Sequence, residues 1–435
     1  MSTETSSTTS TLPNPQSPSH QAVDPSQAQG AQIPLTDFNI PSFPQEARSL
    51  RALTLTSDIK VDEYQEILER PWTISPTIPA SIEGLTLELF SMGYPKGWLS
   101  ALADRVPNVK SLVVYSQIFG GLSEETTADA VEFFKKLDGL RAVHFLDVFA
   151  KPHFFERISP YLKHNNTSST PGEARRGLMF LEINYTFRHE DEEFMGKIQA
   201  PELPLLIGPG LISLSLNLSE PENAEEDEQD PTTIQGVGTK EGIMAFNKTL
   251  TKELIEALTS EETAPKGLRA LNTTLYTLTP EMIGEVLKDK KNLMVLQMTA
   301  EIEPGEATKK KLLGAIEHLE HLESLEIVAN PSLQFYMDIQ NPRHQVLEKT
   351  FPDVWDMNKL SEKQEKLASF KANVLRTTTL GTIDWERVDE VTFCDMKSSK
   401  SFGTSPVVAQ EAEPIVYLEH PVVESDHQSD MAHTR

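Results

Sequence analysis

The sequence predicts an α/β fold in which short parallel strands alternate with helices in one curved solenoid. The main observation is a triplet of apolar residues, the second three positions after the first and the third two positions after the second, which recurs along the chain. The clearest copy consists of Leu322, Leu325 and Ile327. In a strand, Leu325 and Ile327 would point to the buried face while the residues between and after them point outward.

The copies of this triplet recur at regular intervals. Their first residues are at positions 50, 82, 109, 140, 178, 211, 268, 293 and 322, which gives intervals of 32, 27, 31, 38, 33, 57, 25 and 29 residues. All of these intervals except the one of 57 residues fit a strand, a helix and two turns. Such a recurrence is the sequence signature of a repeat protein, in which each unit stacks on its neighbours.

The segments between the copies carry helix signals. Ser123 is suited to cap a helix that begins with acidic residues, and Gly139 follows its end. Thr279 and Pro280 open another helix in the same way. Helical patterns are predicted at about 61–70, 96–105, 124–137, 154–162, 252–258, 306–319 and 362–375, in addition to the helix that Thr279 and Pro280 open.

Composition divides the chain into three parts. Residues 1–45 are rich in Ser, Thr, Pro and Gln, so we expect a disordered tail. Residues 46–397 form the predicted solenoid, with an acidic disordered insertion at about 219–240 and a C-terminal helical cap at about 345–397. In that cap Val388, Val391 and Phe393 offer either a tenth triplet or a cover for the last apolar face. Residues 398–435 are expected to be a second, acidic disordered tail.

Charge and composition exclude several classes of function. The net charge of -26 would repel a nucleic-acid backbone or an anionic membrane, so we expect neither as a partner. No apolar run is long enough to span a membrane, and no secretion signal is visible, which favours a cytoplasmic or nuclear protein. The single cysteine, Cys394, excludes an internal disulfide. We expect a monomer.

No pattern indicates catalysis or a bound cofactor. His318 and His321 are three residues apart but lack the third ligand that a zinc site needs, so a solvated helix face is the preferred interpretation. No nucleophile motif and no complete phosphate-binding loop is present. The sequence therefore predicts a protein that is not an enzyme and that has neither a metal site nor a cofactor.

The repeated triplet, closed by Asn330 in its last copy, resembles the leucine-rich-repeat superfamily, and more closely its ribonuclease-inhibitor-like type, which has a helix in each repeat. The divergence of the copies is similar to that of F-box-type substrate receptors and of uncharacterised filamentous-fungal proteins. No F-box is visible, because residues 34–50 lack its apolar helical pattern. The resemblance implies a curved parallel sheet on the concave side, helices on the convex side, and binding of a protein.

If the strands lie in register, their outward residues form rows on the concave face. A middle cluster of Tyr115, His144, Leu146 and Phe180 has the bulky side chains that interface hot spots favour. The alternative is that these rows are ordinary exposed sheet residues. The residues predicted to contact a partner are Tyr115, His144, Leu146, Phe180, Glu182, Asn184, Ser215, Asn217, Asn272 and Gln297.

The function predicted from these features is a non-enzymatic scaffold or adaptor that binds a protein partner, of unknown identity, on its concave face. One alternative is a substrate receptor of a ubiquitin ligase that lacks a recognisable F-box. Another is a small-GTPase regulator, which resembles this chain in combining helical leucine-rich repeats with an acidic stretch. In that family the acidic stretch follows the last repeat, whereas here it interrupts the repeats.

Overall fold

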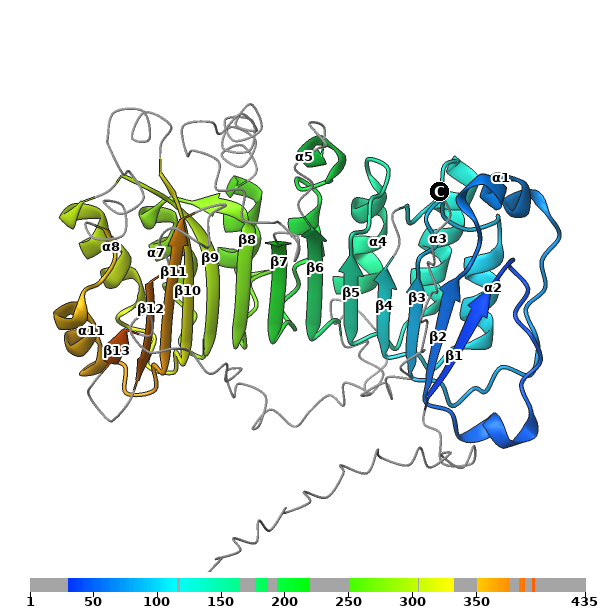
Figure 1. The fold of residues 1–435 in the computed structure, drawn as a ribbon, viewed down its shortest axis with the longest axis horizontal. Helices are drawn as coiled ribbons and strands as arrows, with labels where there is room; N and C mark the ends of the chain where they lie inside the picture. Colours follow the sequence, from blue (N-terminus) through cyan, green and yellow to red (C-terminus); the bar gives the residue numbers. More distant parts are fainter. Residues whose placement is uncertain are drawn as a thin grey trace, which may run out of the picture.

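One continuous sheet organises the molecule. The computed structural model describes residues 30–115, 118–163, 177–186, 194–219, 251–303, 305–331, 350–374, 383–387 and 393–395. In this part of the chain 13 strands form a single sheet, and each strand lies beside the strands that precede and follow it in sequence (Figure 1). The pairings from β1 to β11 are parallel, whereas β12 and β13 are antiparallel to their neighbours. The predicted α/β fold class, a solenoid whose strands stack in one mainly parallel sheet, is confirmed.

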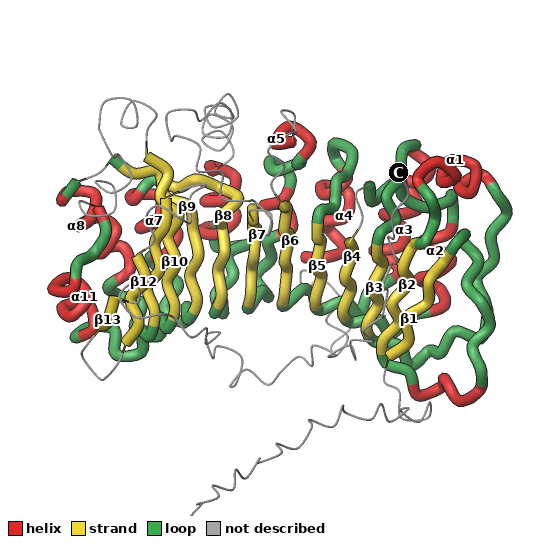
Figure 2. Tube along the Cα trace, viewed as in Figure 1, coloured by secondary structure: helices red, strands yellow, loops and turns green. Residues whose placement is uncertain are grey.

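The strands are short and most of them follow one another through a helix or turn (Figure 2). Their bounds are β1 Gly30–Leu35, β2 Ala52–Ser57, β3 Gly84–Glu88, β4 Ser111–Tyr115, β5 Ala142–Leu146, β6 Phe180–Thr186, β7 Ser213–Ser219, β8 Ala270–Leu278, β9 Val295–Ile302, β10 Ser324–Pro331, β11 Ser369–Val374, β12 Ile383–Arg387 and β13 Phe393–Asp395.

The helices form a second layer, which lies behind the strands in the view of Figure 1. Successive helices pack on one another, as α2 does on α3 and α7 on α8. Residues 251–259 are also helical. The other bounds are η1 Gln45–Ser49, α1 Val61–Glu69, α2 Trp98–Arg105, α3 Glu124–Lys136, α4 Phe154–Lys163, α5 Phe194–Lys197, η2 Leu203–Leu206, α7 Pro280–Leu287, α8 Glu306–Ile316 and α11 Val354–Ser361.

The nine apolar triplets are strands β2 to β10, and their inward side chains form the core between sheet and helices. Leu53 and Leu55 in β2 are fully buried, and so is Leu325 in β10. Burying one such side chain contributes about 2 kcal/mol relative to leaving it in water. Because every rung repeats the same burial, the stack grows by adding one strand at a time.

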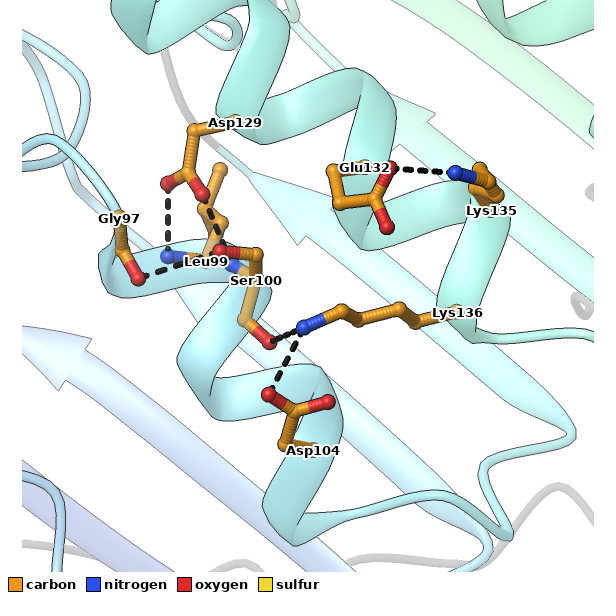
Figure 3. A network of polar contacts seen from close by, with 8 residues as sticks. All are labelled: Gly97, Leu99, Ser100, Asp104, Asp129, Glu132, Lys135 and Lys136. Carbon is orange, nitrogen blue, oxygen red and sulfur yellow. Dashed lines mark hydrogen bonds and ion pairs between the residues drawn. The ribbon is translucent and has the colours of Figure 1, made fainter.

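Helix ends are capped across repeats. The residue before α2, Gly97, has no side chain to cap the helix, and the carboxylate of Asp129 in α3 accepts the free amides instead (Figure 3). The N–H groups of Leu99 and Ser100 lie 3.1 and 3.2 Å from its two oxygens. The Lys136 ammonium donates to the Ser100 carbonyl at 3.1 Å from the same helix face. Helix α3 therefore holds α2 by charge-assisted hydrogen bonds as well as by packing.

The C-terminal ends of three later helices are capped by the following unit. In each case a polar side chain donates to a helix carbonyl. It lies three or four residues before the leucine that opens the next apolar triplet. The bonds run from Lys290 Nζ to the Leu258 oxygen at 2.8 Å, from His318 Nε2 to the Leu287 oxygen at 3.0 Å, and from Gln364 Nε2 to the Ile316 oxygen at 2.5 Å. The prediction that His318 lies on a solvated helix face is therefore wrong, since this ring is partly buried and capping α7.

The solenoid begins earlier than the sequence suggested. Residues 30–45 were expected to belong to a disordered tail of residues 1–45, but β1 pairs in parallel with β2 along its whole length. Phe38 and Ile40, which follow it, are buried in the core. Only one face of this edge strand needs apolar side chains, and Pro34 is tolerated there because an edge strand leaves some amides unpaired. Residues 1–29 lie outside the described part.

The predicted helical cap at 345–397 is also wrong in its detail. Residues 362–375 were expected to be helical, but α11 precedes them and Ser369–Val374 form β11. Leu367, Phe370 and Ala372 are buried and repeat the triplet spacing with less aliphatic residues. Phe393 lies in β13, the last strand of the sheet, which is antiparallel to β12, so this segment does not form a tenth parallel copy. Val388 and Val391 are outside the described residues.

Two further features concern the ends of strands. Asn330, which closes the last copy of the triplet, lies inside β10 beside Glu301, and its buried amide group has no hydrogen-bond partner among the described residues. Of the predicted acidic insertion at 219–240, only Ser219 is described, as the last residue of β7. Residues 220–250 and the predicted tail at 398–435 lie outside the described part.

None of the helices in the ranges given above is both long and apolar enough to cross a membrane.

Candidate functional site

The outward residues of the parallel strands form three rows across the sheet, which we call the strand face. The rows run perpendicular to the strands because neighbouring strands pair without a shift from β2 to the middle of β8. The first row is Ala52, Gly84, Ser111, Ala142, Phe180, Ser213, Ala270, Val295 and Ser324; the second is Thr54, Thr86, Val113, His144, Glu182, Ser215, Asn272, Gln297 and Glu326; the third is Thr56, Glu88, Tyr115, Leu146, Asn184 and Asn217, continued by Thr277, Thr299 and Val328.

A polar ladder crosses the second half of the strand face. Asn217 Nδ2 donates to Asn184 Oδ1 at 3.2 Å, and the Thr274 hydroxyl donates to Asn217 Oδ1 at 2.5 Å. The ladder then passes to Asn272, whose Oδ1 accepts the backbone N–H of Thr274 at 3.0 Å. It continues through an Asn272 to Gln297 bond of 2.7 Å and a Gln297 to Glu326 bond of 3.1 Å. These amides satisfy one another along the sheet and hold their side chains in fixed positions.

The middle of the strand face differs from the ladder. His144 Nδ1 lies 2.8 Å from Glu182 Oε2, and the histidine side chain is mostly buried while the glutamate is 37% exposed. Tyr115, which pairs in register with Leu146, is 41% exposed. Here large side chains lie at the surface beside the His144–Glu182 hydrogen bond, whereas in the ladder the polar groups bond to one another.

Charge on the strand face has one sign. The three rows from β2 to β10, as described, contain Glu88, Glu182 and Glu326 but neither lysine nor arginine. Lys371 in β11 pairs in register with Glu326 and lies 3.9 Å from Asp384. Carboxylates on a surface that carries neither lysine nor arginine create a local field that favours basic ligands.

The structure places all ten predicted contact residues on the strand face, in the rows that the triplet spacing indicated. It brings together Tyr115 with Leu146, Asn184 with Asn217, and Asn272 with Gln297. Phe180 lies in the first row between Ala142 and Ser213, and Ser215 lies between Glu182 and Asn272. That these residues contact a partner stays a prediction.

The third row is displaced at β8. The triplet spacing alone would place Thr274 beside Thr299, but the register shifts between Thr273 and Thr277, so Thr277 takes that place. The displaced Thr274 joins the polar ladder instead, and Thr299 donates to its backbone carbonyl at 2.9 Å. A bulge of this kind re-aims a side chain without breaking the sheet.

Sequence reasoning missed one exposed apolar residue beside the strand face. Leu89 follows β3 with φ of 61° and is 51% exposed. Its N–H donates to the Tyr115 carbonyl at 2.6 Å, which places the leucine beside the tyrosine strand. No signal in the sequence marks a left-handed leucine, because the residue types that favour this conformation are Gly, Asn and Asp.

Within the described ranges, no group of three or more His, Cys, Asp or Glu side chains has the geometry to hold a metal ion.

Comparisons with known proteins add the following. No protein-family model matches the chain, and no curated protein matches it. Among solved structures, the chain is similar to one described as the crystal structure of the Rad7 and Elc1 complex in yeast, with 15% identity, coverage of 80% of this chain and 81% of that chain, and a TM-score of 0.33. It is also similar to an internalin from Listeria monocytogenes, with 10% identity, coverage of 71% and 81%, and a TM-score of 0.27.

Proposed function

We propose that this protein is an interaction scaffold or adaptor that binds a protein partner on its strand face. The observation that supports this most is the contrast along that face between the satisfied polar ladder and the exposed side chains around Tyr115. Exposed apolar residues that lie together on a rigid surface are typical of protein-binding sites. Repeat solenoids offer extended surfaces of this kind, because each unit adds one strand to the same face.

The backbone of the site is already satisfied, which bears on how a partner would bind. Each inner strand of the sheet has a neighbour on both sides, so a ligand on the strand face cannot add as a further strand. Recognition would rest on side chains, and the fixed positions in the ladder would lower the entropy cost of binding. This favours a partner with a complementary surface or a well-defined segment.

Affinity purification of the full-length chain tests the proposal. We would compare the natural sequence with a triple variant in which Tyr115, His144 and Phe180 are changed to Ala. A matched control changes Glu132 and Lys135 of α3 to Ala, since these side chains lie in the helix layer, are largely exposed and pair with each other at 2.9 Å. Unfolding of all three proteins in urea shows whether each retains the fold.

We expect the triple variant to lose proteins that both the natural chain and the control retain. An identical set of bound proteins for all three would contradict the proposal. The same purification separates the narrower roles: a ubiquitin-ligase core protein among the retained partners would indicate a substrate receptor, and a small GTPase whose nucleotide hydrolysis the chain alters would indicate a regulator.

A further inference from the structure

An exposed apolar surface lies at the carboxyl ends of β3, β4 and β5. We call it the apolar rim and define it by Leu89, Tyr115 and Leu146. Leu89 is 51% exposed and Tyr115 is 41% exposed, and Leu146 is partly exposed beside the tyrosine. The hydrogen bond from the Leu89 amide to the Tyr115 carbonyl holds the backbones of these two residues side by side.

The conformation of Leu89 costs folding free energy. A leucine at φ of 61° is strained, because its Cβ approaches the backbone in the left-handed region. Asp147 occupies the corresponding place after β5, with φ of 50°, and its carboxylate accepts the Thr186 amide at 2.7 Å. The aspartate is thus suited to the turn, whereas the leucine contributes no such bond. A strained side chain that is also exposed and apolar points to a role outside folding.

Two carboxylates flank the apolar rim. Glu88 pairs in register with Tyr115, and its Oε2 accepts the Thr56 hydroxyl at 2.9 Å. Gln32 supports that hydroxyl from β1 at 3.2 Å, so a polar chain positions the carboxylate. On the other side Glu182 is held by His144. The rim is therefore apolar in its centre and acidic at both sides.

We infer that the apolar rim binds a partner segment in which an apolar side chain stands close to a lysine or arginine. This inference rests on the proposed function and specifies its partner. The apolar side chain would cover Leu89, Tyr115 and Leu146, and the basic side chain would pair with Glu88 or Glu182. The absence of lysine and arginine from the three described rows between β2 and β10 leaves these carboxylates as the charges that select the ligand.

Selection from a displayed library of short random peptides against the full-length chain tests the inference. The enriched peptides are then titrated against variants that keep the backbone geometry. Leu89→Asn retains a residue that tolerates the left-handed conformation, and Tyr115→Ala removes the ring. A double variant, Glu88→Gln with Glu182→Gln, removes the charges but keeps the hydrogen-bond acceptors. Leu205→Asn, at an exposed leucine in η2, is the matched control.

We expect the enriched peptides to carry an apolar residue next to a basic one and to bind Leu89→Asn and Tyr115→Ala at least about tenfold more weakly. The double glutamine variant should bind several-fold more weakly at low salt and should lose most of the salt dependence. Leu205→Asn should bind like the natural chain.

Four results would overturn the inference, and they differ in what else they affect. If no peptide is enriched, the inference fails and the proposed function is unaffected. If the enriched peptides bind the rim variants normally but fail to bind Asn217→Ala, a variant in the polar ladder, the inference fails while the strand face remains a binding site. If enriched peptides bind every strand-face variant normally, the proposed function loses its surface as well. Enrichment of acidic peptides would contradict the charge selection directly.

Discussion

The ammonium of Lys309 in α8 lies 2.8 Å from the carboxylate of Asp356 in α11, and both side chains are only about one-tenth exposed. Glu306 lies 3.0 Å from the same ammonium. The carboxylate also belongs to the capping box of α11, where it accepts the Asp353 amide at 3.3 Å. One charge pair therefore joins the last regular repeat to the unit that covers it.

Replacing Lys309 with Met should destabilise the C-terminal end of the solenoid. The change leaves the buried Asp356 carboxylate without its cation, which costs about 2–4 kcal/mol in comparable sites. In a repeat protein such a loss is local, so hydrogen exchange should accelerate in α11 and β11 and stay unchanged in α2 and α3.

Lys311→Met is the matched control, because this lysine pairs with Glu281 at the surface, where both side chains are more than half exposed. Its effect on unfolding should stay below about 0.5 kcal/mol. Equal effects of the two substitutions would show that burial does not set the strength of the Lys309 pair.

The same pair predicts a dependence on alkaline pH. Burial lowers the pKa of Lys309, but the hydrogen bonds that its ammonium donates to Asp356 and Glu306 outweigh this effect and leave the pKa above its ordinary value. The pair's contribution is therefore complete below the unfolded pKa of about 10.4 and is lost as pH rises through the folded pKa. The difference in urea midpoint between the natural chain and Lys309→Met should narrow above that pH.

The contribution of Lys290 to stability should change with pH in the opposite direction. Burial lowers its pKa, so the folded state releases this proton at a lower pH than the unfolded state does. Stability contributed at this position rises with pH between the folded pKa and the unfolded value. In Lys290→Met that rise should be missing from urea midpoints measured as a function of pH. A midpoint that follows the same pH curve in both proteins would show that this lysine does not titrate differently on folding.

Replacing Asp129 should destabilise the first turn of α2 more than its own helix, α3. Asp129→Ala removes the acceptor for the Leu99 and Ser100 amides and should cost about 1–2 kcal/mol, since the helix has no other side-chain cap at that end. Hydrogen exchange at the first turn of α2 is the direct measurement. Glu132→Ala, one turn further along α3, removes only a surface pair with Lys135 and should leave that exchange unchanged.

The parts of the fold that could be predicted are those in which apolar spacing carries the information. Leu322, Leu325 and Ile327 specify a strand by their positions alone, and eight similar copies specify its neighbours. Strand β11 was not predicted, because Phe370 and Ala372 stand where most other copies have Leu, Ile or Val and the lysines around them are typical of a helix surface. Strand β1 was not predicted, because an edge strand needs only a few apolar residues and Pro34 is unusual in a strand.

The strand face was predicted because register follows from the triplets, whereas its finer features depend on contacts between units. The bulge after Thr273 moves Thr274 into the ladder, and no sequence pattern within that repeat predicts this change of register. The left-handed turn at Leu89 is imposed by the pairing of β3 with β4, against the preference of leucine. Such features arise from tertiary structure, which overrides local propensity.

The polar ladder should be sensitive to the direction of its hydrogen bonds. Asn184 only accepts in the ladder, from Asn217 Nδ2 at 3.2 Å and from the Ser219 hydroxyl at 3.1 Å, so Asn184→Asp keeps both bonds. Asn217 donates on one side and accepts from Thr274 on the other. Asn217→Asp therefore places an oxygen against the Asn184 oxygen and should lower the free energy of unfolding by about 1–2 kcal/mol more than Asn184→Asp does.

Urea unfolding of the two variants measures the difference, and hydrogen exchange in β6 and β7 locates it. Equal stability of the two aspartate variants would mean that the ladder does not run in the direction described, and the fixed surface on which a partner would dock would lose its physical basis.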